Sequence, residues 1–112
     1  MSAPHLTQLL VLEQAERLAD GAGGFTSVWH EVCTHWAEIT SGAGRQTAGE
    51  EVFLSQVPYR ITLRAAPIGS IARPRPEQRL RLGARIFTIL AVAEKDAAGK
   101  YLVCFSREEV PA

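Results

Sequence analysis

The chain has 112 residues, a formal net charge of zero and a hydrophobic fraction of 46%. These values are typical of one globular domain with a single core, so we expect one domain over residues 1–112. There is no apolar run near the ~20 residues of a membrane helix. No basic segment precedes the short apolar run near the N-terminus, so we also expect no signal peptide.

The first residues that form an element, Leu6–Leu18, suit either an amphipathic helix or an alternating strand, and periodicity alone does not decide between them. The next segment, Asp20–Gly24, contains three glycines and predicts a turn, because glycine adopts positive φ without steric cost. A phosphate-binding loop is excluded here, since the segment is too short and lacks the following Lys and Ser/Thr.

The segment Thr26–Ile39 is also ambiguous between helix and strand, although its β-branched and aromatic residues favour a strand. On a regular strand Trp29 and Trp36 point to opposite faces, unless a bulge changes the phase. We therefore expect Trp36 to anchor the core and Trp29 to lie nearer the outer surface. The following residues, Thr40–Gln56, predict a long loop, of a kind that tends to be functional or disordered.

The second half of the chain predicts short strands joined by turns. Pro58–Ala65 has the clearest alternation of apolar and polar residues, and the proline-rich segment Ala66–Gln78 predicts a loop. Because no helix is long enough for a crossover, these strands indicate an antiparallel sheet or a small barrel. The remaining strands are expected at Arg79–Leu82, Arg85–Ala93 and Tyr101–Ser106, with a turn at Asp96–Gly99.

Charge is distributed unevenly along the chain. Between Val52 and Ala93 seven arginines accompany one acid, Glu77, so this segment carries +6 and the remainder carries −6. Opposite potentials on different faces suit nucleic-acid binding or a head-to-tail interface between identical subunits, and a solvated strand face is the third interpretation. The arginines are Arg60, Arg64, Arg73, Arg75, Arg79, Arg81 and Arg85.

Residues with catalytic or metal-binding chemistry do not form a recognisable site. His30 and His35 are five residues apart, one more than the zinc-protease helix requires. Cys33 and His35 would share a strand face, but no orienting group or oxyanion site accompanies them. We interpret Cys33 and Cys104 as free thiols, with a disulfide as the alternative. The sequence therefore predicts no enzyme, no cofactor and no metal.

The order of the features resembles the small head–tail joining proteins of tailed bacteriophages, also called head closure or stopper proteins. It is especially similar to those of gene transfer agents of α-proteobacteria. The likeness covers about Leu6 to Glu109. The residues that carry it are Asp20, Gly21, Gly23, Gly24, Phe25, Trp29, Trp36, Ala37, Glu38, Ile39, Tyr59, Arg60, Ile61, Thr62, Arg64, Gly83, Arg85, Phe87, Ile89 and Glu109. The neutral-to-acidic opening strand, Leu6–Ala15, and the proline-rich segment Ala72–Glu77 depart from the family pattern.

The resemblance implies an all-β fold, a small antiparallel β-barrel of about six strands with long inter-strand loops. It also implies a strand at Thr26–Ile39. Members form a ring in the neck of the virion, between the portal and adaptor and the tail, and help to retain packaged DNA. The partners implied are copies of the chain itself, an adaptor or portal-side protein, a tail terminator or tail-side protein, and packaged DNA through non-specific contact. Assembly would take place in the bacterial cytoplasm.

Two sets of residues follow as candidates for contacts in such an assembly, and a neighbouring subunit could also cover Trp29. The long loop would reach into the channel or onto the next subunit, through Gly42, Gly44, Arg45, Gly49, Glu50 and Glu51. Inter-subunit charge contacts are expected at Arg73, Arg75, Arg79 and Arg81. The alternatives are a small β-barrel nucleic-acid-binding module and another neck protein such as a tail terminator.

Overall fold

The computed structural model describes residues 3–41 and 56–109. Within these ranges the chain contains six β-strands and no helix, so no helix of the described part could cross a membrane. The prediction of an all-β fold of about six strands is confirmed, and both ambiguous segments in the first half are strands. The strands are β1 (Gln8–Ala19), β2 (Phe25–Ser41), β3 (Gln56–Arg64), β4 (Arg79–Leu82), β5 (Arg85–Glu94) and β6 (Tyr101–Glu109).

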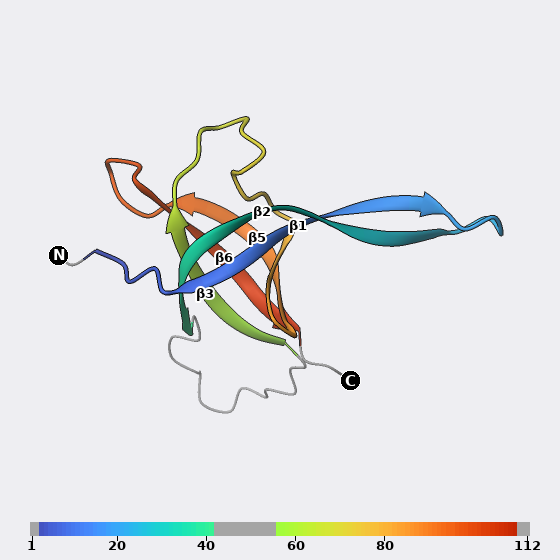
Figure 1. Cartoon of the computed structure of the whole chain (residues 1–112), viewed down its shortest axis with the longest axis horizontal. Helices are drawn as coiled ribbons and strands as arrows, with labels where there is room; N and C mark the ends of the chain where they lie inside the picture. Colours follow the sequence, from blue (N-terminus) through green and yellow to red (C-terminus); the bar gives the residue numbers. More distant parts are fainter. Residues whose placement is uncertain (1–2, 42–55, 110–112) are drawn as a thin grey trace, which may run out of the picture.

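The six strands form one closed antiparallel sheet in the order β1-β2-β3-β6-β5-β4 (Figure 1). The sheet closes where β4 pairs with β1, through only three residue pairs between Val11–Glu13 and Arg79–Arg81. By comparison, β3 and β6 pair over nine residues each. Closure leaves the barrel without a free edge at this seam, which removes a site at which sheets otherwise associate.

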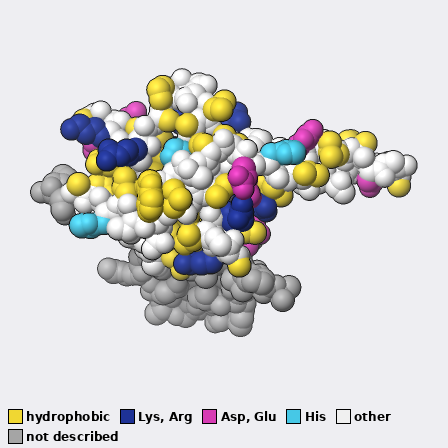
Figure 2. Space-filling model, viewed as in Figure 1, with side chains coloured by type: hydrophobic (Ala, Val, Ile, Leu, Met, Phe, Trp, Pro, Cys, Tyr) yellow, Lys and Arg dark blue, Asp and Glu magenta, His cyan; other side chains and the backbone are white. Residues whose placement is uncertain are grey.

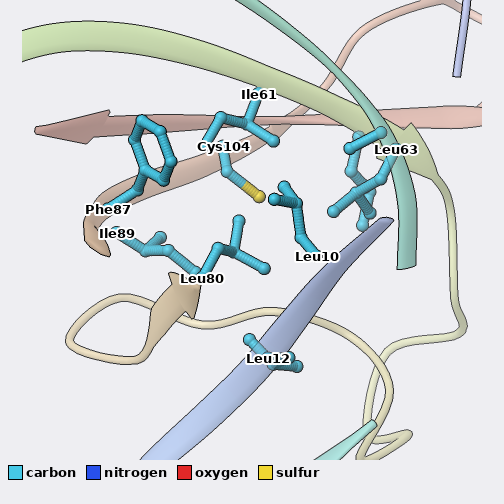
Figure 3. Packing of buried hydrophobic residues seen from close by; sticks show 10 residues of the cluster. Leu10, Leu12, Ile61, Leu63, Leu80, Phe87, Ile89 and Cys104 are labelled. Atoms are coloured by element: carbon cyan, nitrogen blue, oxygen red, sulfur yellow. The ribbon is translucent and has the colours of Figure 1, made fainter. Parts of the chain in front are cut away.

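The core lies inside the barrel and contains one face of each strand. The predicted alternation in β3 is confirmed at four residues, because Ile61 and Leu63 are fully buried while Arg60 and Arg64 are exposed, but Thr62 is also buried. Tyr59 packs edge-on against Phe87, with ring centroids 5.5 Å apart. Figure 3 shows side chains from β1, β3, β4, β5 and β6 converging on one interior. The buried cluster consists of Leu10, Leu12, Ala37, Ile61, Leu63, Leu80, Phe87, Ile89, Leu102 and Cys104.

A bulge in β2 changes which of its side chains face outward. Leu12 pairs with Cys33 but Glu13 pairs with Glu31, so Val32 is an extra residue in β2. The inserted residue reverses the alternation and puts both tryptophans on the outer face of the sheet. The prediction that Trp36 anchors the core is therefore wrong: its side chain is 55% exposed.

The first two strands continue beyond the barrel as a two-stranded arm, residues Gln14–His30 (Figure 1). In this stretch β1 and β2 pair only with each other, from Gln14 opposite His30 to Ala19 opposite Phe25. The expected turn closes the arm. The Oδ1 atom of Asp20 accepts hydrogen bonds from the backbone N–H of Ala22 at 2.8 Å and of Gly24 at 3.0 Å.

The proline-rich connection between β3 and β4 is irregular, as predicted, but it is fixed to the barrel by several contacts. Pro74 is buried, and the carbonyl oxygen of Ala72 accepts a hydrogen bond from Nε2 of His35 at 2.7 Å. Nη1 of Arg73 donates to the carbonyl oxygen of Ala66 at 3.0 Å within the connection, and the backbone N–H of Glu77 donates to the carbonyl oxygen of Ile89 in β5 at 2.9 Å. These contacts position the connection against the inner-facing residues of β2.

Candidate interaction surfaces

The arm presents apolar side chains to solvent along much of its length. Phe25 is 61% exposed, and Leu18 and Val28 are also exposed. The guanidinium of Arg17 lies 4.4 Å from the ring centroid of Phe25, which leaves the other face of the ring open. Figure 2 shows hydrophobic side chains along the projecting arm. An isolated two-stranded hairpin is at best marginally stable in water, so these residues indicate a surface that another molecule covers.

A compact charge cluster fixes the base of the arm. Glu13 is only 4% exposed and accepts hydrogen bonds from Nε of Arg79 at 2.6 Å and Nε of Arg81 at 2.8 Å. Arg81 also donates from Nη2 to Glu31 at 3.1 Å, and the guanidinium of Arg79 lies 4.0 Å from the ring centroid of Trp29. We call these five residues the arm root, because they join β4 to both strands of the arm.

The electrostatics of the arm root keep its buried carboxylate charged. Burial raises the pKa of Glu13, but the hydrogen bonds and positive charges of Arg81 and Arg79 outweigh this effect and lower the pKa below its ordinary value. The hydrogen bond to Glu13 in turn raises the pKa of Arg81. Because a carboxylate with two charged donors is held in one geometry, the arm root orients the arm relative to the barrel.

A second ion pair lies where β5 meets β6. Arg85 donates from Nε and Nη2 to the two oxygens of Glu108, at 2.7 and 3.0 Å, and its guanidinium lies over the rings of Tyr59 and Phe87. The hydrogen bond from Arg85 lowers the pKa of Glu108. A groove of about 380 Å³ opens beside this pair and is lined mainly by polar residues, including His5.

The barrel wall formed by β3, β6 and β5 has an apolar and basic surface. Phe105 pairs with Arg60 on one side and with Ala91 on the other, and all three side chains are exposed. The guanidinium of Arg60 lies 6.0 Å from the ring centroid of Phe105. Leu90 is 48% exposed in the adjacent strand. We call this surface the far wall, defined by Arg60, Arg64, Leu90, Ala91 and Phe105.

The four arginines expected to contact a neighbouring subunit all have partners within their own chain. Arg79 and Arg81 bind Glu13, and Arg73 donates to a backbone carbonyl. Nη2 of Arg75 donates to Oε1 of Gln14 at 3.0 Å. An inter-subunit role for these four residues stays a prediction. The loop candidates Gly42, Gly44, Arg45, Gly49, Glu50 and Glu51 lie outside the described residues.

Both thiols and His35 lie in the barrel strands, whereas His5 and His30 are exposed. Cys33 and Cys104 are free thiols. Sγ of Cys33 lies 3.6 Å from Nε2 of His35, on the strand face that the sequence predicted they share. Burial raises the pKa of the Cys33 thiol and raises that of Cys104 to about 12. Both thiols are thus protonated at neutral pH, which makes them poor nucleophiles.

Two features of these surfaces, the ion pairs of Glu13 and the projecting arm, are not predicted from the sequence. Glu13 lies far from Arg79 and Arg81 in the sequence, and its only signal is an acid within an otherwise apolar run. The arm had a clearer signal, since the first two strands are much longer than the four residues available to β4. Among the described residues, no three His, Cys, Asp or Glu side chains are grouped so that they could hold a metal ion.

Comparison with known proteins gives matches that extend over nearly the whole chain. A family model described as phage head completion protein matches residues 1–109. A solved chain from the virion of a native gene transfer agent particle is 59% identical, with a TM-score of 0.80, and the match covers 98% of this chain and 100% of that one. No curated protein matches.

Proposed function

The chain belongs to the phage head completion protein family, and from this membership we propose that it is a structural component of the head–tail neck in a phage-like virion. The observation that carries this proposal is the family match over residues 1–109. It is supported by the 59% identity to a chain of a gene transfer agent virion, over the full length of that chain.

Within that role, the chain acts as a head closure, or stopper, protein. Copies of it form a ring between the portal or adaptor and the tail, and the ring helps to retain packaged DNA. Exposed apolar residues on two distinct surfaces, the arm and the far wall, support this arrangement, because a ring of identical subunits joins two different patches of the same protein. The loop residues from Gly42 to Glu51 are proposed to reach the channel or the next subunit.

The chemistry of the described residues favours a structural connector over an enzyme or a nucleic-acid-binding module. The buried thiols are protonated at neutral pH, so the nearest approach to a nucleophile–base pair, Cys33 and His35, is inactive. Arg79 and Arg81 are paired with the carboxylates of Glu13 and Glu31, which reduces the positive charge available for phosphates. Contact with packaged DNA is therefore non-specific, and the chain has no catalytic role in the particle.

Deletion of the gene in the bacterium that produces the particles tests this function. We expect capsids that lack attached tails and lose their DNA, as seen by electron microscopy and by nuclease sensitivity of the packaged DNA. Expression of the intact chain should restore DNA-filled, tailed particles. Normal particles in the deletion strain would contradict the proposal.

A second variant addresses the loop. Deletion of Gly42–Gly49 removes only residues outside the described barrel, so the purified variant should unfold cooperatively like the intact chain. In the producing bacterium it should give heads that lose DNA or fail to join tails. Normal DNA-filled, tailed particles would contradict a role for this loop in the neck.

A further inference from the structure

We propose that the arm of each subunit seats on the far wall of the next copy in the ring, an inference that rests on the proposed function. The arm supplies the face that carries Phe25, which is the opposite face of the ribbon from Leu18 and Val28, and the far wall supplies Leu90 and Phe105. The partner is a second copy of this chain, bound head to tail.

The arm needs cover on two sides, because a two-stranded ribbon has no layer behind it. One face carries Phe25 and Trp29, opposite Ala19 and Ala15 in β1. The other face carries Val28, opposite Glu16. A hairpin of this size is at best marginally stable alone, so cover by a sheet surface stabilises its extended form.

Strand order places the apolar part of the far wall across the barrel from the arm, whereas Arg60 and Arg64 lie in β3, next to β2. In the closed order β1-β2-β3-β6-β5-β4, β1 lies across the barrel from β6, and β2 lies across from β5. The arm extends from β1 and β2, whereas Phe105 lies in β6 and Leu90 in β5. A subunit can therefore give its arm on one side and receive an arm on the other, which is the arrangement that a closed ring requires.

Charge on the two surfaces is complementary. Between Gln14 and His30 the arm carries two acids and one base, Arg17. Glu16 lies 2.6 Å from Nε2 of His30, and Asp20 accepts the two backbone hydrogen bonds of the turn. The far wall carries the exposed arginines Arg60 and Arg64 beside its apolar residues. Contact of the arm with this wall brings carboxylates toward guanidinium groups, whereas contact between two arms or two far walls would oppose like charges.

The arm root lowers the entropy that the arm loses when it binds the next copy. Six residues of strand beyond Glu13 extend the arm by about 20 Å, at roughly 3.3 Å per residue. A ribbon of that reach loses much orientational freedom on binding unless its base is already fixed. The two hydrogen bonds to Glu13, at 2.6 and 2.8 Å, and the stacking of Arg79 on Trp29 fix the base before the partner arrives.

Photo-crosslinking in assembled particles tests this contact. A benzophenone analogue of phenylalanine replaces Phe25 in the full chain, particles are purified, and crosslinked peptides are identified by mass spectrometry after irradiation. We expect a band at twice the monomer mass, in which the Phe25 analogue is joined to β5 or β6 of a second copy. The reciprocal analogue at Phe105 should crosslink to residues 16–28 of a second copy.

The matched control places the same analogue at Ile68, which is 84% exposed on the proline-rich connection and belongs to neither surface. It should give no crosslink to β5, β6 or the arm. Should the Phe25 variant fail to assemble, the Phe105 variant decides the outcome alone. Crosslinks from these sites to another neck protein, or none at all in DNA-filled, tailed particles that contain the chain, would overturn the inference. Absence of the chain from wild-type particles would instead refute the proposed function.

Discussion

Glu13 is the buried carboxylate on which two strands and the arm depend. Replacement by glutamine leaves Arg79 without its charged acceptor and Arg81 with only the exposed Glu31, at a site where Glu13 is 4% exposed. We expect Glu13→Gln to reduce the free energy of unfolding by about 1–3 kcal/mol at pH 7, measured by urea denaturation. The matched control is Glu31→Gln, an exposed partner of Arg81, which should change it by less than about 0.5 kcal/mol. Equal losses in both variants would contradict the importance of the buried pair.

The same residue predicts a dependence of stability on pH. The folded pKa of Glu13 lies below its ordinary value of 4.5, so its ionised form stabilises the fold above that value. This contribution is lost as the pH falls through the lowered folded pKa. We therefore expect the stability difference between wild type and Glu13→Gln to shrink between pH 7 and pH 3, measured by denaturation at both values. A constant difference would show that ionisation of Glu13 does not stabilise the fold.

The two tryptophans give a direct test of the bulge. Because Trp36 is exposed and Trp29 is half-buried against Arg79, Trp29→Phe should leave an emission that acrylamide quenches readily. Trp36→Phe should leave an emission that is quenched less. The opposite order would restore the arrangement that the sequence predicted, with Trp36 inside.

The error at Trp36 shows what alternation can and cannot predict at single residues. Parity correctly separated Ile61 and Leu63 from Arg60 and Arg64, because β3 is regular. In β2 the extra residue, Val32, lies between the tryptophans and reverses their relation. Valine is common in regular strands and bulges alike, so no local signal gave the position of the bulge.

At the scale of elements, the arm can be removed without disturbing the core. The buried cluster begins at Leu10 and Leu12 and resumes at Ala37, so none of it lies in the arm. Joining Ala15 to Trp29 through Asn-Gly, a sequence that favours a tight hairpin turn, should give a variant that unfolds cooperatively in circular dichroism. In the producing bacterium this variant should give particles without tails.

The control for the shortened arm is the intact chain expressed at the same level from the same vector. Tailed particles from the shortened variant, at wild-type yield, would contradict a role for the arm in assembly. Loss of cooperative unfolding would instead show that the arm contributes to the stability of the barrel.

The positions of the strands were largely predictable from the sequence, but the pairing between strands and between their side chains was not. Alternation and turn residues located β3 to β6 within a few residues, and the glycines predicted the turn that closes the arm. The arm itself depends on where β4 stops pairing with β1, which is decided by long-range register. The pairing of Glu13 with Arg79 and Arg81 has the same origin, so it could not be read from neighbouring residues.

At the scale of the whole molecule, we expect the purified chain to be a monomer or only weakly associated. Its exposed apolar residues are divided between separate surfaces, and we expect ring formation to need contact with the adaptor as well. Sedimentation velocity at micromolar concentration should give a single species near the monomer mass. A stable ring in the purified protein would contradict this prediction.

The all-β fold and the family were both accessible from the sequence, because they rest on features distributed over the whole chain. The order of the glycine turn, the tryptophan-bearing strand and the later strands carried the resemblance, and residues 1–109 match the family model. Contacts with neighbours were not accessible in the same way. From the sequence, Arg79 is a candidate for contact with a neighbouring subunit. In the fold its guanidinium already binds Glu13 of the same chain.

The short seam between β1 and β4 has a mechanical consequence. Only three residue pairs close the sheet there, and the arm begins where they end, at Glu13. A force that pulls on the arm therefore acts on the shortest strand pairing of the barrel. There Arg79 and Arg81 of β4 hold Glu13 of β1 by hydrogen bonds. Because the carboxylate of Glu13 is buried and its pKa lies below the ordinary value, acid weakens this joint by protonating Glu13, whereas salt screens such a buried pair only slightly.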